Sequence, residues 1–472
     1  MKQVTKFVDP KIARNFMLPR NIGETTWTAN SELSRTTKLV REPEQVDLTQ
    51  IFPAKIIEKP RVTEPVINAN LWIDNIYSPS SADIGKFWKI QRSEILSLLP
   101  EGLAGELPRD LILTPSRTSD MGIMLRRATF EITKELQALG SKTTPWDARG
   151  WLLDGKRGVG KSSVLSFVVA WARKQGWMVI FEPLAGRFSR DIGEIKRSSG
   201  GIFMQNGFAQ SFLERTAVCN KQFFEKIPCN MKVYGRRSLD GSSVRSTRKV
   251  FFPLVSKAVD AELESVKDAS EESAMLRRRL QRLADLSGDI VLPSMVQRLP
   301  KPSTVWDIVE FGIQNESFST QAVAELFSQL KVQTSFPLLV AADEFNETLP
   351  VSQYVSKRYD GTKFNGFIPG YHLSMGRVFS KFQAGTYARG VCLFSTSWKF
   401  RKRRNFRAEL LGAKEGDVKI VKEFTPAEYS NFVAYYHMQK ILYSFPRDQL
   451  EYFYMCSQGN GFQVRKLLST LY

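Results

Sequence analysis

Residues 155–162 combine the residue types that hold a phosphate chain in nucleotide-binding proteins. Gly155, four further residues, and then Gly160, Lys161 and Ser162 have the Walker A spacing. Glycines allow main-chain amides to converge on phosphate oxygens, because no side chain blocks the approach. The lysine of such a loop reaches the outer phosphates, and the serine hydroxyl ligates Mg²⁺. The segment therefore predicts a phosphate-binding loop.

The segments on either side of the loop are those that must position it. Residues 151–153 are apolar, and apolar residues with helical spacing follow the loop over 164–171. A helix that starts here presents its unpaired amides and the positive end of its dipole to the same anion. A second apolar stretch, 177–181, completes a strand–loop–helix–strand unit. The predicted nucleotide-binding residues are Gly155, Lys156, Arg157, Gly158, Val159, Gly160, Lys161, Ser162 and Ser163.

A second segment, residues 337–344, supplies carboxylates of the kind that a nucleotide site needs. It is apolar up to Asp343 and Glu344, so the acidic pair ends a predicted buried strand. Phosphate-loop proteins use a carboxylate from a neighbouring strand for Mg²⁺, so Ser162 and Asp343 are the predicted metal ligands. Glu344 is a candidate catalytic residue that would polarise the attacking water. Acidic pairs also end many ordinary strands, which is the alternative.

Two further positions could sense the terminal phosphate of a nucleotide. Residues 390–394 predict another buried strand, and three hydroxyl residues, 395–397, follow it. The alternative is that these three residues belong to an ordinary polar loop after the strand. Arg465 is either a second sensor or a surface arginine. The chain has no Asn-Lys-x-Asp motif, which reads guanine in GTPases. The motifs in the sequence therefore do not determine whether the nucleotide carries guanine or adenine.

The charge balance indicates a polyanionic partner. Lysine and arginine number 67 against 48 acidic residues, a formal net charge of +19 at pH 7, which favours a nucleic acid. Residues 399–407 hold six basic residues interleaved with Phe400 and Phe406, a pattern suited to phosphate contact and base stacking. A solvated charge run is the alternative. The predicted RNA-binding residues are Lys399, Arg401, Lys402, Arg403, Arg404 and Arg407.

Composition argues against several other classes of protein. The apolar run 336–342 is far too short to cross a bilayer, so no membrane span is expected. The four cysteines are scattered and the chain has only two histidines, which argues against a zinc site and a disulfide framework.

We predict an α/β fold in which a P-loop NTPase-like parallel sheet is flanked by helices. Residues 1–80 would form an extended basic N-terminal arm, and 81–410 the nucleotide-binding domain with a long insertion at about 185–335. Residues 411–472 would form a C-terminal helical domain. The first residues weakly resemble a mitochondrial targeting segment, although prolines interrupt an amphipathic helix there; a basic arm that lies on a partner is the alternative.

Local patterns predict helices on both sides of the nucleotide-binding unit. Before it, Phe87 and Trp88 are assigned to the same helical segment as residues 95–96, and residues 124–136 to another. After it, Thr425 and Glu428 flank a proline as in a capping box, which predicts the start of a helix.

These pieces together resemble the death-associated-protein family of mitochondrial small-subunit ribosomal proteins, which carry a P-loop fold of the AAA or STAND type. Besides the loop, residues 339–343 and Asn346 are similar to the family's Val-Ala-Val-Asp-Gly-x-Asn segment. The other segments that match are 99–103, 409–412, 424–428 and 435–436. The resemblance covers about residues 95–472, and the order of the segments makes it fairly specific.

The resemblance implies a structural protein in the head of the mitochondrial small ribosomal subunit, located in the mitochondrial matrix and present in one copy per subunit. Such a protein contacts ribosomal RNA and other mitochondrial ribosomal proteins, and helps to form a bridge to the large subunit. It would hold a purine nucleotide, GTP or GDP with Mg²⁺, with ATP or ADP as the alternative. The family's site residues carry over to Gly155, Gly160, Lys161, Ser162 and Asp343.

One departure keeps an enzymatic alternative open. The family pattern has glycine where this chain has Glu344, so an active AAA- or STAND-type ATPase that remodels nucleic-acid or protein complexes is the rival hypothesis. Slow hydrolysis of the nucleotide would be its signature. A third hypothesis is an RNA-binding protein whose nucleotide pocket is vestigial.

Overall fold

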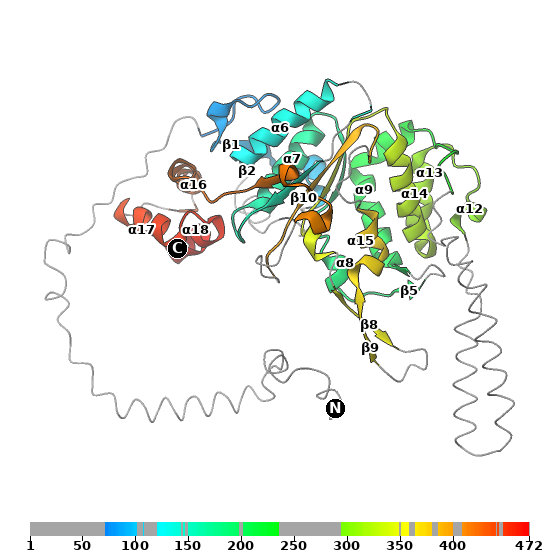
Figure 1. Cartoon of the computed structure of the whole chain (residues 1–472). Coiled ribbons are helices and arrows are strands. Elements are labelled where there is room, and N and C mark those ends of the chain that lie inside the picture. Colours follow the sequence, from blue (N-terminus) through cyan, green and yellow to red (C-terminus); the bar gives the residue numbers. More distant parts are fainter. Residues whose placement is uncertain are drawn as a thin grey trace, which may run out of the picture. The chain divides into compact units, whose positions relative to one another are not determined.

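The computed structural model describes most of the chain from residue 71 onward (Figure 1). The described residues are 71–101, 107, 120–142, 145–146, 150–197, 202–235, 294–348, 351–357, 364–379, 386–399, 408–439, 441–442 and 447–471. The predicted N-terminal arm lies outside them up to residue 70. Within the described ranges, no helix is both long enough and apolar enough to cross a membrane.

A five-stranded parallel sheet forms the centre of the fold, with the strand order β11-β3-β10-β7-β4. The strands are β3 (Trp151–Asp154), β4 (Met178–Glu182), β7 (Leu338–Ala342), β10 (Gly390–Ser395) and β11 (Val418–Ile420). Every residue of the first four is buried. Near-continuous apolar runs are typical of parallel strands that are covered on both faces. The predicted α/β class with a P-loop-like sheet is confirmed.

Two hydrophobic clusters cover the two faces of this sheet. Successive residues of β7 alternate between them: Val340 belongs to one cluster, whereas Leu339 and Ala341 belong to the other, as the two-residue period of a strand requires. The first cluster includes α9 (Asn206–Lys226), α13 (Val305–Gln314) and α14 (Ser319–Val332). The second includes α4 (Arg92–Leu98), α6 (Arg127–Gly140) and α7 (Lys161–Lys174). Figure 1 shows these two helical layers.

The predicted helix through Phe87 and Trp88 is wrong. These residues begin β1 (Phe87–Gln91), which pairs antiparallel with β2 (Asp120–Met124). The strand is favoured because alternate residues pack in different places: Trp88 joins the core beside α7, whereas Phe87 stacks on Tyr435 with ring centroids 4.2 Å apart. The segment predicted as helical over 124–136 is helical only from Arg127.

The C-terminal helices are α16 (Pro426–Met438), α17 (Arg447–Ser457) and α18 (Gly461–Leu468). The predicted capping box is confirmed, since Glu428 N donates to Thr425 Oγ1 at 3.2 Å and Thr425 N donates to Glu428 Oε2 at 2.9 Å. These helices form a hydrophobic cluster of their own, which includes Phe87 and Met124 of the β1–β2 pair. The C-terminal region is thereby packed against the N-terminal strands.

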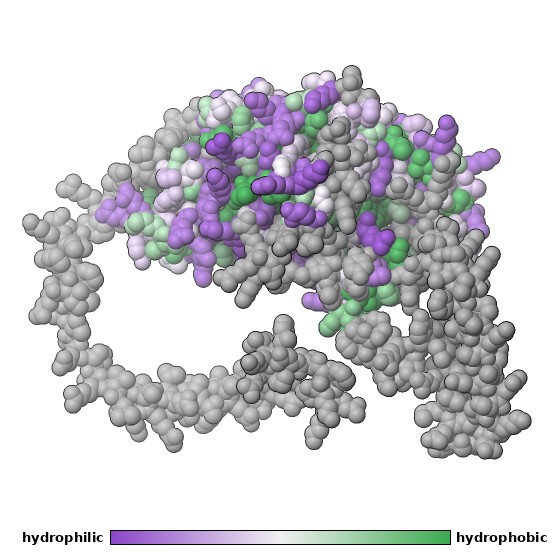
Figure 2. Space-filling view, viewed as in Figure 1, coloured by the Kyte–Doolittle hydropathy of each residue, from purple (hydrophilic) through white to green (hydrophobic). Residues whose placement is uncertain are grey.

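Smaller elements complete the described part of the chain. Among them are α8 (Arg187–Arg190), β5 (Lys196–Arg197), β6 (Phe203–Met204), α12 (Met295–Arg298), η6 (Phe345–Glu347), β8 (Val351–Lys357), β9 (Phe364–Pro369) and α15 (Ser374–Val378). On the face shown in Figure 2, hydrophilic and hydrophobic residues are interspersed over the described surface.

Candidate functional site

The loop between β3 and α7 has a backbone that only glycine adopts easily. Gly155, Gly158 and Gly160 have φ angles of +152°, +85° and +94°, in the region that L side chains rarely occupy. Space is limited as well, because a Cβ on Gly155 would lie 2.4 Å from Val421 O and one on Gly158 would lie 2.6 Å from Phe462 Cβ. The three glycines therefore fix the path of the loop.

Lys161 is the first residue of α7, and its buried side chain folds back over the loop. Its Nζ donates to Gly155 O at 3.0 Å and to Lys156 O at 2.9 Å. The ammonium group is thus held at the loop, where the sequence predicted that it would meet phosphate. In the same turn, the Ser162 hydroxyl donates to the carboxylate of Asp343.

Asp343 follows β7 directly and is buried at the carboxyl edge of the sheet. Its carboxylate accepts from Ser162, from Ser395 Oγ, and from Glu344 N at 2.7 Å. Burial raises the pKa of this carboxyl, while those hydrogen bonds and the charge of Lys161 act in the opposite direction. A carboxylate and a hydroxyl are the hard oxygen donors that Mg²⁺ prefers. The predicted metal ligands, Ser162 and Asp343, therefore lie together and their chemistry fits this ion.

The Glu344 side chain forms an ion pair with an arginine that belongs to no motif in the sequence. The carboxylate forms an ion pair with Arg190 of α8, and Lys399 also acts on it electrostatically. Burial raises the pKa of Glu344, and Arg190 opposes that rise. Its backbone is left-handed, with φ +54°, a conformation that costs a non-glycine residue about 1–3 kcal/mol. A family pattern with glycine at this position is consistent with that backbone.

The hydroxyl residues after β10 tie the ends of neighbouring strands together. Ser395 bonds to Asp343, and Thr396 Oγ1 donates to Asp154 Oδ1 at 2.8 Å. Asn346 bonds to both main-chain polar groups of Ser397: its Nδ2 donates to Ser397 O at 2.8 Å, and its Oδ1 accepts from Ser397 N at 2.6 Å. Of the three hydroxyls, Ser395 is the one that contacts the predicted magnesium ligand. Arg465, the other sensor candidate, is a half-buried residue of α18.

The predicted RNA-binding run is only partly described. Lys399 is exposed and lies close enough to Glu344 to influence its pKa. The other five predicted residues, which are Arg401, Lys402, Arg403, Arg404 and Arg407, lie outside the described residues.

Two arginines that contact residues of the candidate site gave no usable signal in the sequence. Arg190 pairs with Glu344, and the buried Arg126 donates from Nη1 to Val159 O of the loop at 3.1 Å. Neither belongs to a recognisable motif, and the chain has 67 basic residues. Their roles depend on contacts with distant segments, which local spacing does not reveal.

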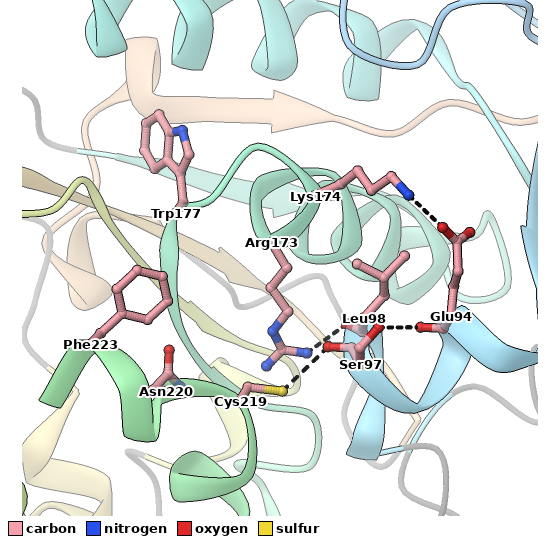
Figure 3. Close-up of a pocket in the computed structure, with 9 residues that line it drawn as sticks. All are labelled: Glu94, Ser97, Leu98, Arg173, Lys174, Trp177, Cys219, Asn220 and Phe223. Carbon is pink, nitrogen blue, oxygen red and sulfur yellow. Dashed lines mark hydrogen bonds and ion pairs between the residues drawn. The ribbon is translucent and has the colours of Figure 1, made fainter. Parts of the chain in front are cut away.

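A cavity of about 260 Å³ lies at the other end of α7 (Figure 3). Its lining includes Arg173 and Lys174, but Arg173 Nη2 is paired with Glu101 Oε1 at 2.7 Å and Lys174 is paired with Glu94. None of the predicted site residues lines this cavity. The loop end of α7 therefore remains the candidate functional site.

Comparison with protein families agrees with the resemblance noted in the sequence. The model of the family described as mitochondrial ribosomal death-associated protein 3 matches residues 123–467, which is well over half of the chain. The match spans the loop, Asp343, the strands of the central sheet and most of the C-terminal helices. The chain therefore belongs to the mitochondrial ribosomal death-associated protein 3 family and is a protein of the mitochondrial small ribosomal subunit, located in the mitochondrial matrix.

Proposed function

We propose that this protein holds a purine nucleotide and Mg²⁺ at residues 155–163, and that the nucleotide serves mainly as a structural cofactor of a ribosomal protein. The main support for the proposal is that Lys161, Ser162 and Asp343 lie close together at one end of α7. GTP or GDP is the expected nucleotide, with ATP or ADP as the alternative.

Each residue has a definite part in this proposal. The loop amides and Lys161 would bind the phosphates, and Ser162 and Asp343 would hold Mg²⁺ directly or through water. The bound ion would neutralise phosphate charge. Because Asp343 is buried, its interaction with a cation would be weakened little by solvent.

A structural role is favoured by the surroundings of Glu344. A general base needs a carboxylate that can accept a proton from water, and here that carboxylate is already engaged by Arg190. A ligand that binds the native state stabilises the protein without any turnover, by about 2.7 kcal/mol at a hundredfold excess over Kd. Retention of the nucleotide is therefore sufficient for the proposed role.

Calorimetric titration of the purified protein tests nucleotide and metal binding. We expect Mg·GTP to bind the wild type, Lys161→Ala to abolish detectable binding, and Asp343→Asn to reduce mainly the Mg²⁺-dependent part of the affinity. Arg127→Met is a suitable control, because the Arg127 side chain is 83% exposed and pairs with Glu131 on its own helix. Binding that is equal in the wild type and Lys161→Ala would contradict the proposed site. Parallel titrations with Mg·ATP determine the base preference.

The alternative function is an active ATPase of the AAA or STAND type. It is favoured by one observation, that Glu344 follows the predicted metal ligand directly and lies at the same sheet edge. Steady-state hydrolysis by the wild type and Glu344→Gln discriminates between the two functions. A wild-type rate that is abolished by the substitution would support the enzyme, whereas nucleotide retention without turnover in both proteins would support the structural cofactor.

The proposed partners are ribosomal RNA and neighbouring mitochondrial ribosomal proteins, with one copy of the chain per small subunit. The net charge of +19 supports RNA contact, as does the basic run at 399–407. Neutralising Arg401, Lys402, Arg403 and Arg404 should reduce the slope of log affinity against log salt by about 0.7–0.9 for each phosphate that the run no longer neutralises. Neutralising the exposed Arg127, Lys196 and Lys221 provides the control. An unchanged slope in the first variant would exclude the run as a phosphate-binding segment.

A further inference from the structure

The main-chain carbonyls of the phosphate loop are held by hydrogen bonds from two sources. Lys161 Nζ holds the carbonyls of residues 155 and 156. Segments far away in the chain hold the next three carbonyls, at residues 157–159. Asn460 Nδ2 donates to Arg157 O at 2.8 Å, Phe462 N donates to Gly158 O at 2.9 Å, and Arg126 Nη1 donates to Val159 O at 3.1 Å.

These contacts determine which side of the loop the amide groups face. A trans peptide is planar, so the N–H of each residue points away from the carbonyl that precedes it. When the carbonyls at 157–159 are bonded to Asn460, Phe462 and Arg126, the N–H groups at 158–160 are directed away from those donors. An anion-binding loop needs its amides directed toward the ligand. The outer hydrogen bonds therefore favour the conformation that binds phosphate.

Arg126 connects this loop to the segment that leads into α16. Its Nε donates to Glu428 Oε1 at 2.9 Å, and its Nη2 donates to the carbonyls of Lys422 and Glu423 at 2.8 and 3.2 Å. The guanidinium also lies 4.6 Å from the centroid of the Phe424 ring. A buried arginine with this many partners has little freedom to move, so the position of the loop and that of the C-terminal segment depend on each other.

Steric contact at Gly158 strengthens the same connection. Added at Gly158, a Cβ would lie 2.6 Å from both Asn460 Oδ1 and Phe462 Cβ. The start of α18 thus rests directly on the loop. Arg157 also lies over the Phe462 ring, 6.0 Å from its centroid.

We infer that Arg126, Asn460 and the first turn of α18 form a clamp that sets the phosphate loop in its anion-binding form, so that α16 and α18 are part of the nucleotide site. This inference rests on the proposed nucleotide binding. It adds that nucleotide occupancy and docking of the C-terminal helices are coupled. Because such coupling is reciprocal, a bound nucleotide strengthens the docking of α18 by the same factor by which docking strengthens nucleotide binding.

The test uses the full-length protein and compares Arg126→Met with Arg127→Met. The first substitution removes the hydrogen bond to Val159 O of the loop and those to the segment before α16, and the second removes a neighbouring exposed arginine that pairs with Glu131 on its own helix. We expect the Kd for Mg·GTP to rise about tenfold or more in Arg126→Met, since hydrogen bonds from charged groups are among the stronger ones, and to stay unchanged in Arg127→Met. Arg126→Lys, which keeps the positive charge but has a single donor nitrogen, should restore part of the affinity.

Hydrogen exchange of the α18 amides supplies a readout that a merely structural role would not change. Addition of Mg·GTP should slow exchange over residues 461–468 in the wild type, but much less in Arg126→Met and Asn460→Ala. Because Arg126→Met leaves the buried Glu428 without its partner, the double variant with Glu428→Gln covers the case in which the single variant fails to fold.

The outcomes separate this inference from the proposed function. If the wild type binds nucleotide and the Arg126 and Asn460 variants bind it equally well, with equal protection of α18, the clamp is overturned and nucleotide binding stands. If the wild type binds no nucleotide, the proposed function and the clamp both fail. Weaker binding together with reduced protection of α18 supports the clamp.

Discussion

Helix α7 buries a cation near each end, and the two cations have different acceptors. In the first turn, Lys161 donates to two main-chain carbonyl oxygens, which are neutral. In the last turn, Arg173 donates from two nitrogens to the carboxylate of Glu101, at 2.7 and 3.0 Å. Arg173 is thus bonded directly to a carboxylate, whereas Lys161 is bonded to main-chain carbonyls of the loop and lies near enough to Asp343 for its charge to oppose the rise that burial causes in the pKa of that carboxyl. At the far end the cation is part of an ion pair that stabilises the fold, and at the loop end it is held among the residues that the sequence predicts for nucleotide binding.

The contrast extends to the shape of each end. The loop end combines a left-handed glycine path, a clamp from distant segments and the pair of Ser162 and Asp343. The far end is a cavity between α4, α7 and α9 in which Lys174 is paired with Glu94 and Arg173 with Glu101. The cavity therefore holds none of the residues that the sequence predicts for nucleotide binding.

The largest effect should follow from breaking the ion pair at the far end. Glu101→Ala leaves Arg173 buried without its carboxylate, and removal of one member of a buried pair costs about 3–5 kcal/mol. We expect the free energy of unfolding in urea to fall by that amount, while nucleotide still raises the stability of the variant as much as that of the wild type. Glu94→Gln is the control, because its pair with Lys174 is partly exposed and is worth at most about 1 kcal/mol. Loss of the nucleotide effect in Glu101→Ala would show that the two ends are not independent.

A smaller effect, mainly on the stabilisation by bound nucleotide, is expected at the loop end. Lys161→Ala should remove the stabilisation by bound nucleotide, about 2.7 kcal/mol at a hundredfold excess over Kd. It should also lower the stability without nucleotide, since two hydrogen bonds to the loop are removed and each contributes about 0.5–1.5 kcal/mol. Thermal unfolding with and without Mg·GTP measures both effects. Lys174→Ala is the matched control at the far end, and an equal nucleotide effect in both variants would contradict the distinction between the two ends.

The smallest predicted effect concerns the rim of the loop. Lys156 Nζ forms an ion pair with Glu423 Oε1 at 2.7 Å, and this interaction lowers the pKa of the Glu423 carboxyl. A carboxyl with a lowered pKa in the folded state stabilises the protein above its ordinary pKa, and that contribution is lost as the pH falls through the lowered value. Because the pair is partly exposed, Lys156→Ala should cost only about 0.2–1 kcal/mol near neutral pH. Unfolding curves recorded from neutral to acidic pH should show the difference from the wild type shrinking toward zero. A difference that grows on acidification would contradict the assignment.

Local patterns were sufficient to predict the elements around the candidate site that depend on short spacing. The Walker A spacing, the acidic end of the strand at Asp343 and the capping box at Thr425 each lie within about eight residues, so a single segment holds the whole signal. The parallel sheet followed from the same strand–loop–helix–strand pattern. The family match supports the order in which these segments occur.

Features that depend on pairing between distant segments were not predicted. The β1 strand was assigned to a helix because its partner, β2, lies beyond a whole helix in the sequence. Arg126 and Arg190 were missed because each acts on a segment far along the chain, Glu428 and Glu344 respectively. Neither arginine belongs to a motif with a recognisable spacing, and the backbone strain at Glu344 is visible only from its φ angle.

The most direct test of the central claim is the nucleotide content of the purified native protein. Denaturing extraction followed by chromatography and mass spectrometry would identify the base, the number of phosphates and the amount per chain. We predict close to one purine nucleotide per wild-type chain, with bound Mg²⁺, and little or none in Lys161→Ala. The absence of nucleotide from the wild-type protein, or equal amounts in both proteins, would contradict the proposed role of the loop.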